Sequence, residues 1–207
     1  MNPADQPDMS FSLAIIAGGQ SRRMGRDKAF VKLGGKALIE HVITRSADLG
    51  QAETILITNM PAQYAHLGLP MYRDLLPNKG SLGGIYTALL QARSPDVLVL
   101  ACDMPFVSTD LLRYMVDQIR ADNDIVVPRV DGYPQGLHAI YKTTCITPIA
   151  EQLAADRLKI IRFYEQMRVH YLDESDYAAF DPQGRSFANI NTPEELAEAE
   201  LLLRAAN

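Results

Sequence analysis

The sequence predicts an α/β protein with three layers, in which helices cover both faces of a Rossmann-like, mostly parallel sheet. Short apolar runs rich in β-branched residues alternate along the chain with segments of helical periodicity. One of these runs, residues 96–102 (DVLVLAC), is continuously apolar after its first residue, as a strand covered on both faces should be. The 207 residues, 47% hydrophobic and 22% charged, are enough for one domain with a sizeable core.

Strands are expected where these apolar runs stand between polar or turn-forming segments. In chain order, the expected strands are residues 12–17, 54–58, 70–73, 96–102, 125–128, 137–142 and 169–172. Helices are expected where apolar residues recur every three or four positions. In chain order, the expected helices are residues 37–49, 81–92 and 109–121, a helix that starts at Thr147-Pro148, residues 157–167, and a last helix that starts at Thr192.

The last helix has the clearest start signal in the chain. Thr192 can cap it, Pro193 suits its first turn, and Glu195 can bond back to the cap. This capping box is a sufficient structural reason for Thr192 and Glu195, so neither is assigned to a site. In a sheet built from such alternation, ligands bind at the carboxyl ends of the strands. We therefore look for function in the loops that follow the first four strands.

Composition excludes several classes of protein. Lys plus Arg total 20 and Asp plus Glu total 25, a net charge of −5, which argues against non-specific nucleic-acid binding. The longest hydrophobic run, residues 97–102, is far shorter than the ~20 residues of a membrane span. The first ten residues do not resemble a signal peptide, and the two cysteines show no metal-binding spacing. We expect a cytoplasmic protein that binds neither nucleic acid nor membrane, with a mobile tail (1–11) and a single domain (12–207).

The loop after the first strand, residues 18–28, has a composition that suits a polyphosphate. Its three glycines would let backbone N–H groups approach phosphate oxygens, and its four cations would neutralise the charge. The glycines are Gly18, Gly19 and Gly25, and the cations are Arg22, Arg23, Arg26 and Lys28. Neither P-loop nor dinucleotide-fingerprint spacing is present. The alternative is a solvated basic turn.

Asp103 follows the buried strand directly. A carboxylate there is costly to bury unless it meets a cation or hydrogen-bond donors. Mg²⁺ takes few protein carboxylates and completes its shell with water and phosphates, so Asp103 is the best metal candidate. The alternative is that Asp103 only caps a turn before Pro105.

At the first loop the chain resembles a known family. Residues 16–28 read I-A-G-G-x-S-x-R-M-G-x-D-K, which resembles the L-A-G-G-x-S-x-R-M-G-x-D-K signature of the molybdenum cofactor guanylyltransferases. Three later segments also match: Asp103-Met104-Pro105, residues 74–84 with Ser81 in the usual proline position, and residues 187–195 (FANINTPEE). The resemblance extends from Leu13 to about Leu203 and implies a nucleotide-diphospho-sugar transferase-like fold, nucleotide-binding in its N-terminal half and acceptor-binding in its C-terminal part.

The resemblance also implies roles for individual residues. Nucleotide binding would involve Ile16, Ala17, Gly18, Gly19, Gly25, Lys28, Asn59, Asp74 and Asp103, with Asp103 holding Mg²⁺. Catalysis would involve Lys28, Arg23 and Asp103, and the acceptor would contact Asn189, Asn191 and His138. Simpler structural explanations stay open: a solvated loop carboxylate for Asp74, turn chemistry for the three asparagines, and a core position for His138.

The activity implied by the resemblance is transfer of GMP from GTP to Mo-molybdopterin, with release of pyrophosphate and a requirement for Mg²⁺. Transient contacts with molybdopterin insertion proteins and molybdoenzymes would follow. The pair Gly18-Gly19 favours guanine, because cytidylyl relatives tend to have Ala-Ala-Gly there. The alternatives are a molybdopterin cytidylyltransferase, a sugar-1-phosphate nucleotidylyltransferase, a nucleotide-binding module without chemistry, and a structural partner that binds no nucleotide.

Overall fold

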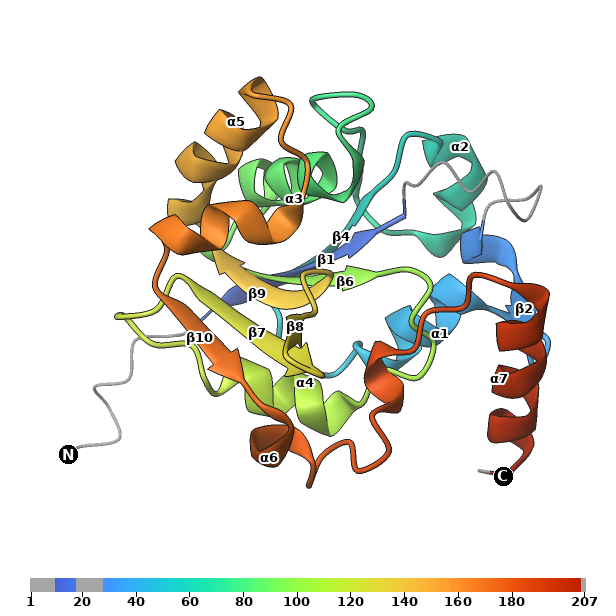
Figure 1. Cartoon of the computed structure of the whole chain (residues 1–207). Helices are drawn as coiled ribbons and strands as arrows, with labels where there is room; N and C mark the ends of the chain where they lie inside the picture. The colour runs from blue at the N-terminus through green and yellow to red at the C-terminus, as the bar shows by residue number, and fades with distance from the viewer. Residues whose placement is uncertain (1–9, 18–27, 206–207) are drawn as a thin grey trace.

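A computed structural model of the chain describes residues 10–17 and 28–205 (Figure 1). Its centre is an eight-stranded sheet with the order β10-β7-β9-β6-β1-β4-β5, and β8 pairs with β7 beside this path. The strands are β1 (Phe11–Ile16), β4 (Glu53–Ile57), β5 (Met71–Tyr72), β6 (Asp96–Ala101), β7 (Ile125–Val130), β8 (Tyr133–Pro134), β9 (His138–Lys142) and β10 (Val169–Leu172). A separate two-stranded hairpin joins β2 (Lys32–Leu33) and β3 (Lys36–Ala37).

The helices surround this sheet on both sides. The α-helices are α1 (Leu38–Arg45), α2 (Pro61–Tyr64), α3 (Gly80–Gln91), α4 (Thr109–Val116), α5 (Ile146–Ala154), α6 (Glu174–Tyr177) and α7 (Pro193–Ala205). Short 3-10 helices are η2 (Lys28–Phe30), η3 (Ala65–Leu67), η4 (Thr143–Cys145), η5 (Ile160–Gln166) and η6 (Arg185–Phe187). Within the two described ranges, no helix is both long and apolar enough to cross a membrane.

The sheet is mostly parallel, as predicted. β1 runs parallel to β4 and β6, β4 to β5, and β7 to β10. β9 runs antiparallel to both of its neighbours, β6 and β7. The carboxyl ends of β1, β4, β5 and β6 therefore lie at one edge together with the amino end of β9, where His138 stands opposite Leu100.

Two apolar cores lie on opposite faces of the sheet. Leu13 and Ile15 of β1 point to a core that also contains residues of α1 and α4. Ala14 and Ile16 point to the other core, which is closed by α3, α5 and η5 (Figure 1). All six residues of β1 are buried, because a strand covered on both faces has no solvent-exposed side. The predicted three-layer arrangement is confirmed.

Several predicted boundaries differ from the structure. The strand expected from residue 12 begins at Phe11, and α1 and α4 end well before residues 49 and 121. After α4, Ile119 is still buried, but its N–H bonds to the carbonyl of Val116, three residues back, in a tight turn. Helical periodicity of burial therefore continues beyond the α-helix itself. The segment 157–167 forms the 3-10 helix η5, and α5 begins at Ile146 rather than after a Thr147 cap.

The last helix, α7, packs against the β2–β3 hairpin. Leu33 of β2 shares a small core with Ile190 and with Ala199 of α7. Gly34, at the hairpin turn, donates its N–H to Oε1 of Glu200 at 2.8 Å. α7 therefore lies against the hairpin that follows η2, whose first residue is Lys28.

Candidate active site

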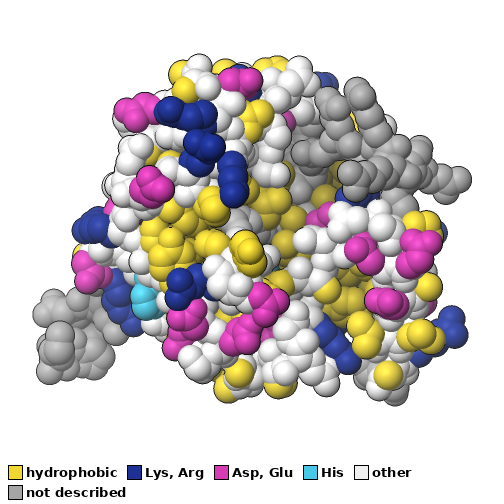
Figure 2. All heavy atoms as spheres, viewed as in Figure 1, with side chains coloured by type: hydrophobic (Ala, Val, Ile, Leu, Met, Phe, Trp, Pro, Cys, Tyr) yellow, Lys and Arg dark blue, Asp and Glu magenta, His cyan; other side chains and the backbone are white. Residues whose placement is uncertain are grey.

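Hydrogen bonds between strand ends define the carboxyl edge of the sheet. The N–H of Ala17 donates to the carbonyl of Ile57, and the N–H of Cys102 donates to that of Ile16. In the view of Figure 1 the carboxyl ends of β1 and β6 point to the right, toward the side where α1, α2 and α7 lie. Figure 2 shows a hollow near the centre of the same face, lined in part by hydrophobic side chains and with Lys and Arg side chains on one rim.

Asp103 lies at this edge, directly after β6. Its side chain is only 18% exposed. Burial raises the pKa of this carboxyl above its ordinary value, the Lys28 ammonium opposes that shift, and the Glu195 carboxylate adds to it. A partly buried carboxylate with a raised pKa gains most from a cation placed beside it.

Three side chains from distant parts of the chain meet here, and we call Lys28, Asp103 and Asn191 the edge triad. The Lys28 Nζ donates to Oδ1 of Asn191 at 2.5 Å and lies 3.9 Å from Oδ2 of Asp103. The backbone reinforces this contact, since the N–H of Ile190 donates to the carbonyl of Asp103 at 3.1 Å. The structure thus joins three residues that the sequence assigned to catalysis, metal binding and acceptor binding.

A second polar pair, Asn59 and Asp74, follows the neighbouring strands β4 and β5. Asn59 Nδ2 donates to Oδ2 of Asp74 at 2.8 Å, and the Asp74 N–H donates to Oδ1 of Asn59 at 3.1 Å. The Arg73 guanidinium donates to the Asn59 carbonyl at 2.7 Å. Burial raises the pKa of the Asp74 carboxyl, and the Asn59 bond opposes this shift.

The start of α3 is packed tightly against the end of β1. A Cβ atom on Gly84 would lie 3.0 Å from Cγ2 of Ile16, and one on Gly83 would lie 2.9 Å from Cβ of Lys79. Close approach therefore explains two glycines that are unfavourable within a helix. Ser81 lies in the first turn of α3, so the helix starts normally with serine in the usual proline position.

The remaining predicted site residues do not belong to the edge triad or to the Asn59–Asp74 pair. Ile16 and Ala17 are buried at the end of β1. Asn189 is exposed on the segment that leads to Asn191. Gly18, Gly19, Arg23 and Gly25, with Arg22 and Arg26, lie outside the described residues.

His138 is not brought to the surface with the edge triad. It has no exposed area, and the Phe187 ring covers it with a centroid separation of 4.9 Å. Neither ring nitrogen has a hydrogen-bond partner among the described residues, and burial lowers the pKa of His138 to about 3. Because the ring has no exposed surface, a molecule bound at the edge does not reach it in this arrangement.

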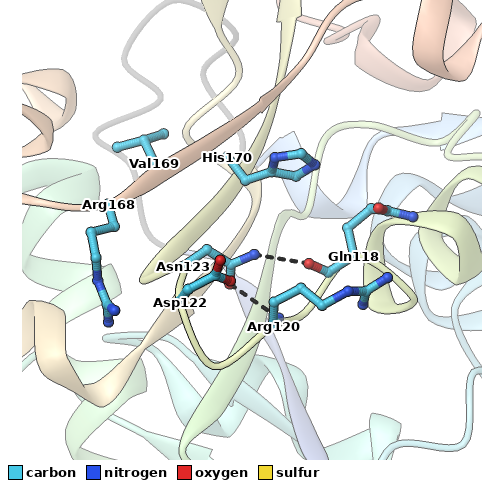
Figure 3. Close-up of a pocket in the computed structure, with 7 residues that line it drawn as sticks. All are labelled: Gln118, Arg120, Asp122, Asn123, Arg168, Val169 and His170. Carbon is cyan, nitrogen blue, oxygen red and sulfur yellow. Dashed lines mark hydrogen bonds between the residues drawn. The ribbon is translucent and has the colours of Figure 1, made fainter.

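A pocket at the opposite edge contains none of the predicted site residues (Figure 3). It is lined by Gln118, Arg120, Asp122, Asn123, Arg168, Val169 and His170. The Arg168 guanidinium bonds to Asp124, and the Arg120 guanidinium bonds to the carbonyls of Asp117 and Ile119. In Figure 3 the two guanidinium groups point in different directions, so they do not converge on a common ligand.

Residues at the carboxyl edge fit a magnesium ion shared with a substrate. Within residues 10–17 and 28–205, no three His, Cys, Asp or Glu side chains are grouped as a complete metal site. Mg²⁺ needs only one or two protein carboxylates when phosphates and water supply the other ligands. The mostly buried Asp103 carboxylate, which lies 3.9 Å from the Lys28 Nζ, meets that requirement.

Sequence reasoning missed Glu195 as a neighbour of this site. Its Oε2 accepts the N–H of Thr192 at 3.0 Å, as a capping box requires, and also the N–H of Asn191 at 2.5 Å. Only the first of these bonds is part of the capping motif. The second could not be found from the motif, because it depends on the path of the chain before the helix.

A doubly covered, mostly parallel sheet whose carboxyl edge gathers charged and amide side chains is typical of nucleotide-binding α/β enzymes. The family model described as the MobA-like NTP transferase domain matches residues 13–170. The chain therefore belongs to this family and is a nucleotidyltransferase, which confirms the family expected from the motifs.

Individual relatives are similar to this chain over nearly its whole length. The probable molybdenum cofactor guanylyltransferase of Pelotomaculum thermopropionicum is 39% identical over 188 residues, which cover 91% of each chain. The protein of the same description from Natranaerobius thermophilus is 36% identical, with coverage of 93% of this chain and 96% of the relative. The crystal structure of molybdopterin-guanine dinucleotide biosynthesis protein A from Archaeoglobus fulgidus superposes with a TM-score of 0.82 at 30% identity, covering 94% of this chain and 99% of that one.

Proposed function

We propose that this protein transfers GMP from GTP to Mo-molybdopterin, forming the guanine dinucleotide of the cofactor and releasing pyrophosphate. The observation that carries the proposal is the edge triad, which places an ammonium, a carboxylate and an amide at the edge where this fold binds nucleotides. The names of the relatives support the identities of the two substrates.

In this reaction an oxygen of the acceptor's terminal phosphate attacks the α-phosphorus of GTP. The bond from that phosphorus to the β-phosphate oxygen breaks, and pyrophosphate leaves with its electron pair. The attacking phosphate is already an anion, so no side chain has to remove a proton. Catalysis is then positioning together with stabilisation of the charge that develops on the leaving group.

Residues of the edge triad suit these two tasks. Lys28, held by Asn191, would offset charge on the departing pyrophosphate together with Arg23. Backbone donors at Gly18, Gly19 and Gly25 would contact the phosphates. Asp103 would hold Mg²⁺, which would neutralise negative charge on the phosphates when bound.

The remaining predicted residues are assigned by their place along the edge. The Asn59–Asp74 pair would contact the nucleoside. The exposed Asn189 amide would hydrogen-bond the pterin, and Asn191 would do so through its amide nitrogen while its Oδ1 keeps the bond to Lys28. His138 is left out of this assignment because its ring is covered. The enzyme would act in the cytoplasm. It would make transient contacts with molybdopterin insertion proteins and with the molybdoenzymes that receive the product.

The choice of nucleotide is tested by thermal unfolding with GTP, CTP, ATP or UTP, each with Mg²⁺ and with EDTA. A ligand at ~100 times its Kd adds about 2.7 kcal/mol, which raises the Tm of a domain of this size by about 5–11 °C. We expect the shift with GTP, weakened by EDTA. A shift with CTP alone would move the product to a cytosine dinucleotide, and no shift with any nucleotide at millimolar concentration would overturn the proposal.

A further inference from the structure

We infer that Glu195 is a positioning residue for the transfer reaction: through the backbone of Asn191 it fixes the amide that holds Lys28 beside Asp103. This inference rests on the proposed function. Capping of α7 would by itself explain a glutamate at position 195. The role inferred here is additional to that cap.

Glu195 makes one bond more than the helix cap requires. Oε2 accepts the N–H of Asn191 at 2.5 Å and the N–H of Thr192 at 3.0 Å. The N–H of Glu195 in turn donates to the Thr192 hydroxyl at 3.2 Å. The bonds between residues 192 and 195 complete the helix cap, so the shorter bond to Asn191 is additional to it.

The side chain of Asn191 holds Lys28 in place. Its Oδ1 accepts from the Lys28 Nζ at 2.5 Å, across 163 positions of the sequence. A lysine ammonium on a flexible stem takes many positions unless an acceptor holds it. Asn191 is therefore the group that fixes the Lys28 ammonium 3.9 Å from the Asp103 carboxylate.

The chain on either side of Asn191 is anchored to the rest of the protein. α7, which begins two residues after Asn191, is anchored on the β2–β3 hairpin by the bond from Gly34 to Glu200 and by a small apolar core. The preceding residue, Ile190, is buried, and its N–H is bonded to the Asp103 carbonyl. Glu195 is the side chain that fastens the residue between these two supports.

The test uses a matched pair of variants at the same helix end. Glu195→Ala removes the bonds to residues 191 and 192, whereas Thr192→Ala removes only the reciprocal cap bond. Both lose part of the cap, so the Tm should fall by a similar few degrees in each. Glu194→Ala, one position along and exposed, controls for the loss of a negative charge.

The principal readout is pyrophosphate release from GTP with Mo-molybdopterin as acceptor, as kcat and KM. Misplacement of a catalytic group by ~1 Å can cost 10²-fold, so Glu195→Ala should lower kcat by about 10- to 100-fold with little change in the KM for GTP. The two control variants should stay within about threefold of wild type. Glu195→Gln keeps an acceptor oxygen and should restore most of the rate.

Two further results connect the effect to Asn191. In an Asn191→Ala background, the Glu195→Ala change should have little additional effect on kcat, because both act through one contact. A crystal structure of Glu195→Ala should show the Lys28–Asn191 bond lost. Equal kcat values for Glu195→Ala and Thr192→Ala, or a preserved Lys28–Asn191 bond in Glu195→Ala, would overturn the inference. An inactive wild type would instead overturn the proposed function.

Discussion

The buried imidazole of His138 makes stability depend on pH in a way that can be calculated. The ring has no exposed surface, both nitrogens lack partners among the described residues, and burial lowers its pKa from 6.5 to about 3. In the unfolded chain the ring returns to an ordinary pKa near ~6.5. The unfolded state therefore binds more protons than the folded state between about pH 3 and 6.5.

The sign and size of the pH dependence of stability follow from this difference in proton binding. Since the unfolded chain takes up the proton first, the free energy of unfolding falls as the pH drops below 6.5. Each pH unit is worth ~1.4 kcal/mol, so lowering the pH from 7 to 5 costs about 2 kcal/mol. His138→Leu abolishes this dependence. At pH 7 the variant should also be more stable by about 1 kcal/mol, because two buried polar atoms without a partner among the described residues are replaced by apolar ones.

The assay is urea unfolding of wild type and His138→Leu at pH 7, 6 and 5, with the exposed His170→Gln as control. The difference between the curves isolates His138, since all other titrating groups are shared. A gap that does not widen as the pH falls would refute the reasoning. Transfer activity in the same variant tests whether His138 contacts the acceptor. A stable but inactive His138→Leu would mean that the ring is uncovered during the reaction.

Other variants test separate parts of the structure. Asp124 is 8% exposed and its pKa is lowered by bonds from Arg168, so Asp124→Asn should cost about 2–3 kcal/mol at pH 7 in urea unfolding; an unchanged midpoint would contradict this. Gly34 has φ +57°, and a Cβ atom at this position would lie 2.3 Å from Cδ2 of Leu203, so Gly34→Ala should lower the free energy of unfolding by about 1–3 kcal/mol. A double variant with Leu203→Ala should recover part of this loss. Lys28→Ala should lower pyrophosphate release by about 10²–10³-fold without lowering the Tm; near wild-type turnover would remove its assignment.

Much of the fold could be predicted because the relevant signals are local. The apolar run at 96–102 predicted a doubly covered strand, and β6 is buried at every position after its first. The cap at Thr192 is formed as predicted, with bonds in both directions to Glu195. The predicted end of α4, at residue 121, was wrong. Ile119 stays buried in a turn after the helix, and the periodicity of apolar residues does not distinguish a turn from a helix.

The site could be located but not assembled from the sequence. The strand-end rule brings Asn59, Asp74 and Asp103 to one edge, because parallel strands end together. The Lys28–Asn191 contact joins residues 163 positions apart and depends on where α7 docks. His138 packs against Phe187, a residue from a segment much later in the chain. Such contacts are set by tertiary packing, which local patterns do not encode.

The most direct test of the proposed function is analysis of the products formed from GTP, Mo-molybdopterin and Mg²⁺ by the wild-type protein. We expect one pyrophosphate for each guanine dinucleotide formed, and a loss of about 10²-fold or more in Asp103→Asn. GTP that binds without pyrophosphate release, with intact acceptor present, would contradict the account and leave a nucleotide-binding protein without chemistry.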